Sequence, residues 1–159
     1  MNPENKKRHA LHEAGHSTIA IMLNVLFTTT DIYDREVDIH GTTKIIVRED
    51  MTIDQKRNAV YAMLAGGFAT GEDASNEKGV AKDYQEARNI IANIIMKGIT
   101  SDTATMLNIE DYLKECEGET KKLVVKYNKF IEAVADELLI KRELSRDQVE
   151  EFINKMPKD

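Results

Sequence analysis

The sequence predicts a mainly helical α+β protein with a small sheet of two or three strands after the first helix. Two observations support this fold class. Apolar residues recur at the three- and four-residue spacing of amphipathic helices through most of the 159 residues. β-branched residues are instead concentrated between residues 28 and 47, in the segments TTTDIYD, EVDI and TTKIIV. The length suits one domain over residues 1–159.

The first helix is expected from about residue 3 to residue 25. Pro3 suits the first turn of a helix, and Asn2 before it is a suitable cap. In the strand region that follows, Gly41 separates the last two β-branched segments and so predicts a boundary between strands.

Three or more further helices are expected after the sheet. Thr52 is a suitable cap for a helix over IDQKRNAVYAMLAGGF, and a third helix over AKDYQEARNIIANIIMK ends at Gly98. Helical periodicity returns after TSDTA, residues 100–104, and Gly118 is the expected break in it. The apolar residues that show this periodicity are Leu123, Tyr127, Phe130, Ile131, Val134 and Leu138. Ser145 and Gln148 form the pattern of a capping box for a final short helix.

Composition narrows the functional classes. The net charge of −6 and the lack of a long basic stripe argue against a nucleic-acid partner. A single cysteine, Cys116, excludes an intramolecular disulfide and suits a reducing compartment. The longest mostly apolar stretch, residues 17–27, contains Asn24 and is too short to span a bilayer. We therefore expect a cytoplasmic protein with no membrane span.

The segment HEAGH, residues 12–16, is the strongest chemical signal. On a helix, His12 and His16 point the same way one turn apart, so that two imidazoles can bind one Zn²⁺. Glu13 lies where it can reach a water on that metal as a general base without ligating the metal. A bare H-E-x-x-H pattern also occurs by chance, but here the other face of the helix is apolar, as a metal site requires.

A catalytic zinc needs a third protein ligand and an open position. His9 lies about 10 Å from His16 along a straight helix, which is too far for both to bind one ion. The extended HExxHxxGxxH pattern is absent. The third ligand is therefore a distant carboxylate or His40, which lies in the predicted sheet.

Three segments in the same order resemble the peptidase domain of the FtsH family of ATP-dependent zinc metalloproteases: LHEAGHSTIA, LAGGFATGED and GVAKDYQEARNIIANII. The run from residue 122 to 153 also resembles the closing helices of that family. The resemblance implies that His12, His16 and Asp83 ligate zinc and that Glu13 is the base. Glu72 is the rival to Asp83, with holding a histidine ring as its more natural role. Without the resemblance, Asp83 reads as an aspartate favoured near a helix N-terminus.

The resulting expectation is a zinc-dependent metallopeptidase that hydrolyses flexible or unfolded polypeptides. The segment GTTKIIVRE offers a strand edge to such a substrate. The chain carries no Walker-type phosphate loop, so we expect this activity to be independent of ATP. Two alternatives stay open: a zinc-containing peptide-binding or adaptor module, and a regulatory partner of a separate ATPase. A homo-oligomer also stays open.

Overall fold

The computed structural model describes residues 3–35, 38–71, 78–98 and 108–157, and their side chains except those of 33–35, 38–40, 78, 79 and 98. Within these ranges the chain forms six helices and one three-stranded antiparallel sheet, which confirms the mainly helical fold class. The elements in chain order are α1 (Pro3–Met22), β1 (Phe27–Arg35), β2 (Asp38–Ile45), α2 (Ile53–Ala69), α3 (Lys78–Gly98), α4 (Ile109–Lys126), α5 (Asn128–Lys141), β3 (Glu143–Ser145) and α6 (Arg146–Asn154).

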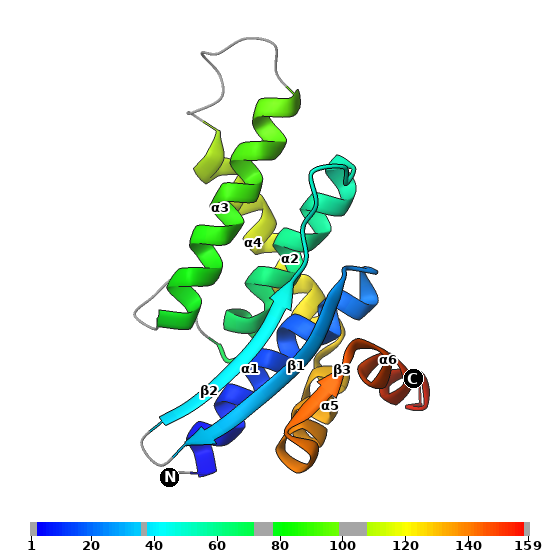
Figure 1. Ribbon diagram of the computed structural model, residues 1–159. Helices are drawn as coiled ribbons and strands as arrows, with labels where there is room; N and C mark the ends of the chain where they lie inside the picture. Colours follow the sequence, from blue (N-terminus) through cyan, green and yellow to red (C-terminus); the bar gives the residue numbers. More distant parts are fainter. Residues whose placement is uncertain (1–2, 36–37, 72–77, 99–107, 158–159) are drawn as a thin grey trace.

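Helix α1 lies at the centre of the fold, between the sheet, the α2–α3–α4 group and the α5–α6 pair (Figure 1). Its middle is fully buried and rich in small residues, which allows close contact with α2. A Cβ added at Gly15 would lie 2.7 Å from the Ala65 carbonyl oxygen and 2.8 Å from the Ala69 Cβ. This close approach fixes the turn of α1 that carries the histidines against α2.

The end of α1 differs from the prediction. The helix stops at Met22 rather than near residue 25, because Asn24 adopts a left-handed conformation with φ of 58°. The next residue, Val25, then donates its backbone N–H to the Ala20 carbonyl. The chain thereby turns directly into β1.

The strand order in the sheet is β2-β1-β3. The prediction that Gly41 separates two strands is wrong, because Gly41 lies inside β2 and pairs with Ile32 of β1. Its lack of a side chain instead makes room for Glu13 of α1, whose carboxylate lies against it. The third strand comes from Glu143–Ser145, more than a hundred residues away along the chain, and pairs with Thr29–Asp31.

The helical boundaries follow the capping signals. Thr52 with Gln55, and Ser145 with Gln148, form capping boxes at α2 and α6. The expected break at Gly118 is wrong: α4 continues through this exposed residue because its apolar face remains packed, and the chain breaks only at Tyr127.

Two apolar clusters fill the interior. One lies between α1, the sheet, α5 and α6, and the other lies between α2, α3 and α4. Helices α1, α2 and α3 meet where the two clusters adjoin, and we call this place the junction. Within the described ranges, no helix combines the length and apolarity that a membrane span requires.

Candidate metal centre

Helix α1 carries two histidines to the junction on successive turns. The rings of His12 and His16 meet edge to face, with centroids 4.7 Å apart. Their Nε2 atoms are 3.0 Å apart. Two imidazoles therefore present their outer nitrogens to one point, as the four-residue spacing predicts.

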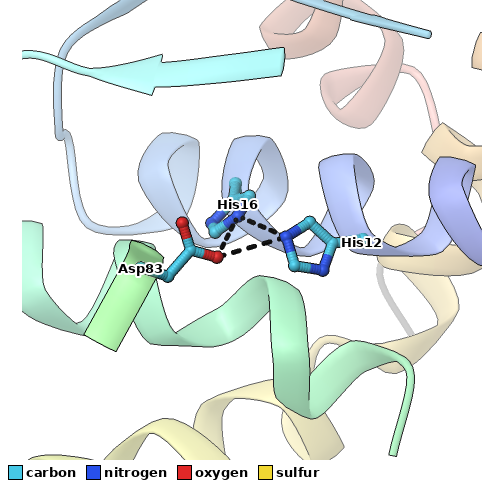
Figure 2. Close-up of side chains that lie close together, drawn as sticks. All are labelled: His12, His16 and Asp83. Atoms are coloured by element: carbon cyan, nitrogen blue, oxygen red, sulfur yellow. Dashed lines mark hydrogen bonds and ion pairs between the residues drawn. The ribbon is translucent and has the colours of Figure 1, made fainter. Parts of the chain in front are cut away.

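Helix α3 supplies a carboxylate to the same point. Oδ2 of Asp83 lies 3.2 Å from Nε2 of His12 and 3.1 Å from Nε2 of His16 (Figure 2). The predicted helix places Asp83 in its first turn. Because α3 begins earlier, at Lys78, Asp83 lies in the second turn instead. The favourable field of a helix N-terminus falls off within the first turn, so the position of Asp83 is better explained by the two imidazoles than by the helix dipole.

A backbone carbonyl of α2 orients the buried histidine. Nδ1 of His16 lies 2.8 Å from the Ala62 carbonyl oxygen, which accepts a hydrogen bond from it. A proton held at Nδ1 leaves the Nε2 of a neutral imidazole with a free lone pair. That lone pair points at the position shared with His12 and Asp83, and such an outer hydrogen bond is typical of metal-binding histidines.

The charges of the trio are strongly coupled. Burial alone would lower the pKa of His16, but the carboxylates of Asp83 and Glu13 raise it to about 9. Burial would raise the pKa of Asp83, but the charge of His16 and the close contacts of both imidazoles with the carboxylate hold it well below its ordinary value. An anion fixed between two basic nitrogens attracts a cation, whether that cation is a proton or a metal ion.

The trio fits a tetrahedral metal ion. Zinc bonds of about 2.0–2.1 Å place neighbouring ligand atoms about 3.3–3.4 Å apart, close to the 3.0, 3.1 and 3.2 Å found here. Asp83 Oδ2 is shielded from solvent and, among the described residues, forms no hydrogen bond of regular geometry. The side chains of His12 and Asp83 keep 16% and 18% of their surface exposed, so one side of the cluster is open.

Helix α2 packs against the two histidines of the trio at a glycine, Gly66. A Cβ added at Gly66 would overlap Nε2 of His16 and lie 2.9 Å from Nε2 of His12. Any larger residue would thus occupy the point at which the ligand nitrogens converge. The helix predicted over IDQKRNAVYAMLAGGF contains Gly66 and agrees with α2 to within one residue, but the prediction did not include this contact with the histidines.

Glu13 lies between α1 and the sheet, beside the trio. Its residue is 5% exposed, and a Cβ added at Gly41 would lie 2.6 Å from its Oε2. Burial raises the pKa of Glu13, although the charges of His16 and His12 and a hydrogen bond from Thr43 oppose this. A carboxylate with a raised pKa is a stronger proton acceptor than an exposed one.

The remaining histidines and Glu72 are placed as follows. His9 is half-buried on α1 and does not join the trio in the part of the chain that the structure describes. The backbone of His40 pairs with Tyr33 in the sheet, but its side chain lies outside the described residues. Glu72 lies outside the described residues altogether.

The chain is distantly similar to one curated protein, ATP-dependent zinc metalloprotease FtsH 1 of Sorangium cellulosum (strain So ce56). The two are 24% identical over an alignment of 188 positions, gaps included, that covers 96% of this chain. The chain spans about 30% of the length of that protein. No family model matches the chain.

Proposed function

We propose that this protein is a zinc-dependent peptidase in which His12, His16 and Asp83 hold the metal ion. The observation that carries the proposal is the convergence of two imidazole nitrogens and one carboxylate oxygen on a single partly open point. The distant similarity to FtsH 1, a zinc metalloprotease by name, supports it. The same three residues are the ligands that the sequence resemblance implies.

Glu13 is the general base in this proposal. When bound, zinc supplies a Lewis acid that makes a water molecule acidic near neutral pH. Glu13 accepts the proton at its carboxylate and later delivers it to the leaving amine. Its burial beside Gly41 supports this role, because a shielded carboxylate exchanges protons with the bound reactants rather than with bulk water.

Strand β2 supports an extended polypeptide as the substrate. It is at the edge of the sheet in the order β2-β1-β3, so its outer backbone groups are not paired with another of the described strands. Gly41 of this strand is in contact with Glu13. A segment that adds to β2 as a further strand would cross the site with its main chain exposed. Only flexible or unfolded chains offer such a segment readily.

The experiment compares hydrolysis of casein by the parent protein and by Glu13→Gln, with Glu132→Gln as the matched control on the exposed face of α5. The parent and Glu132→Gln should cut casein with zinc and stop when EDTA is added. Glu13→Gln should keep zinc but lose turnover, because an amide cannot accept the proton. Full activity of Glu13→Gln would contradict the mechanism, and zinc binding without any hydrolysis by the parent would favour an adaptor module.

A further inference from the structure

A cavity of about 210 Å³ lies beyond the end of β2, away from the metal centre. The segment after β2, the first turn of α2 and the middle of α3 line it, and it is open to solvent on one side. Its lining combines apolar surface, to which Val47 and Ile90 contribute, with the polar side chains of Arg48, Glu49, Lys56, Asn89 and Asn93. The proposed mechanism uses none of these residues.

Lys56 is the central group of this cavity. It is 3% exposed, and its Nζ donates a hydrogen bond of 2.8 Å to Oδ1 of Asn93. Burial and the neighbouring charge of Lys97 lower the pKa of Lys56, while Glu49 and Asp50 oppose this. Lys97 is itself paired with the exposed carboxylate of Glu49, at 3.9 Å.

The hydrogen bond of Lys56 is to a neutral amide, so its charge gains little from that partner. An ammonium group has three donors, and Asn89 and Asn93 have amide N–H donors close by. A carboxylate in the cavity would accept from these donors and offset the repulsion between Lys56 and Lys97. The donors and the charge both select an anion with oxygen acceptors.

The cavity lies on the path of a substrate strand along β2. Gly41 contacts Glu13 at one end of this path, and Val47 lines the cavity six residues later, about 20 Å away in an extended chain. The backbone N–H of Ile46 still bonds to the Leu26 carbonyl, so the extended conformation continues toward the cavity. On α3, Asn89 and Asn93 lie six and ten residues beyond Asp83, about 9 and 15 Å along the helix. Between the metal centre and the cavity an extended substrate would therefore span about three to six residues.

We propose that this cavity binds a carboxylate of the polypeptide substrate, about three to six residues from the bond that is cut. Lys56 carries the recognition, with Asn89 and Asn93 as further donors. The inference rests on the proposed function, because the number of residues between the cleaved bond and the carboxylate assumes that the substrate lies along β2. A carboxylate site of this kind would restrict the substrates to flexible chains that have an acidic residue at a fixed distance from the cleaved bond.

The test measures binding separately from cleavage. Zinc-loaded Glu13→Gln protein is titrated into fluorescent 16-residue peptides of neutral sequence, amidated at the C-terminus, in which one glutamate is moved along the chain. Each peptide is paired with the glutamine version. We expect one or two positions at which glutamate binds about three- to fivefold tighter than glutamine. A peptide with a free C-terminus distinguishes a terminal carboxylate from a side-chain carboxylate.

Lys56→Gln is the decisive variant, because glutamine still donates to Asn93 but has no charge. Lys155→Gln, an exposed residue after α6, removes the same charge elsewhere. The preference for glutamate should vanish in Lys56→Gln and persist in Lys155→Gln. Asn89→Ala, on the exposed side of α3, should weaken the preference without removing the charge and serves if Lys56→Gln does not fold.

The outcomes separate the two proposals. Equal binding of the glutamate and glutamine peptides at every position would overturn the carboxylate site, even if the parent cuts casein. A preference that survives in both Lys56→Gln and Asn89→Ala would overturn it as well. A preference that depends on Lys56, in a protein whose parent never hydrolyses a peptide, would keep this site and overturn the peptidase.

Discussion

The junction and the closing region, residues 128–154 of α5, β3 and α6, are built on opposite principles. In the closing region the described buried side chains are apolar: Ile131, Val134, Ala135, Leu138, Leu144, Val149 and Ile153. At the junction, Glu13 and His16 are buried beside Asp83, whose Oδ2 is shielded from solvent. One region buries hydrocarbon, and the other buries charge.

This difference separates stability from function. Buried apolar side chains stabilise a fold directly. Buried charges lower the stability of the fold unless they are paired or bind an ion of opposite sign. The junction therefore keeps an electrostatic arrangement that a metal ion would complete. Changes at the junction should alter metal binding most, and changes in the closing region should alter the free energy of unfolding most.

The largest effect is expected for the metal ligand from α3. Asp83→Ala should lower zinc affinity by at least about 100-fold, because it removes the only anionic ligand of the trio. Asp136→Ala is the matched control, since Asp136 is an exposed residue of α5 paired with Lys7. Competition with a chromogenic zinc chelator measures both affinities. An Asp83→Ala protein that binds zinc as tightly as Asp136→Ala would contradict the ligand assignment.

Leu138→Ala tests the other half of the comparison. Leu138 is fully buried in the cluster between α1, α5 and α6, so its truncation should lower the free energy of unfolding by about 2–5 kcal/mol. Urea denaturation of zinc-free protein measures this change. Zinc affinity at low temperature, where the variant stays folded, should be unchanged. A parallel loss of zinc affinity would mean that the two regions are not independent.

Gly66 of α2 and Gly118 of α4 should differ in how an added methyl group changes zinc affinity. Gly66→Ala should weaken zinc binding more than tenfold, because its methyl group would overlap the ligand nitrogen of His16. At Gly118 an added Cβ meets nothing within 4 Å, so Gly118→Ala should leave zinc binding unchanged and stabilise α4 by about 0.5–1 kcal/mol. Chelator competition and thermal unfolding of both variants check this pair. Equal zinc affinities would contradict the proposed contact.

The response of zinc binding to pH is gradual and needs no substitution. The pKa of His16 is raised from 6.5 to about 9, so its protonated form stabilises the zinc-free fold fully below about pH 6.5 and ceases to do so as the pH rises through about 9. Zinc must displace that proton. Its affinity should therefore rise by up to about tenfold per unit between pH 6.5 and pH 8. Isothermal titration calorimetry in buffers of different ionisation enthalpy should detect the released proton. A pH-independent affinity would contradict this coupling.

Local patterns made much of this fold readable from the sequence. The HEAGH spacing lies within one helix, and the cap at Thr52 and the capping box at Ser145 are signals of a few neighbouring residues, so no distant contact is needed to interpret them. Asp83 is different: sequence reasoning alone left the third ligand open between a distant carboxylate and His40, and only the family resemblance selected it. Its convergence with the histidines depends on how α3 packs against α2 and α1.

The remaining differences also come from tertiary contacts. Gly41 looks like a strand boundary, and Gly66 lies inside a predicted helix with no local sign of a contact, but a side chain of α1 lies against each of them. Strand β3 is three residues long and is stabilised as a strand by pairing with β1. Gly118 has an unfavourable helix propensity that the packed face of α4 overrides.

The most direct test of the central claim is zinc K-edge X-ray absorption on the protein loaded with one equivalent of zinc. The account predicts a full equivalent bound, with two imidazole ligands, one carboxylate oxygen and a further light-atom ligand at the open position. In Asp83→Ala the imidazole signal should persist at reduced occupancy. A spectrum without imidazole scattering, or with sulfur from Cys116 as a ligand, would contradict a metal centre formed by His12, His16 and Asp83.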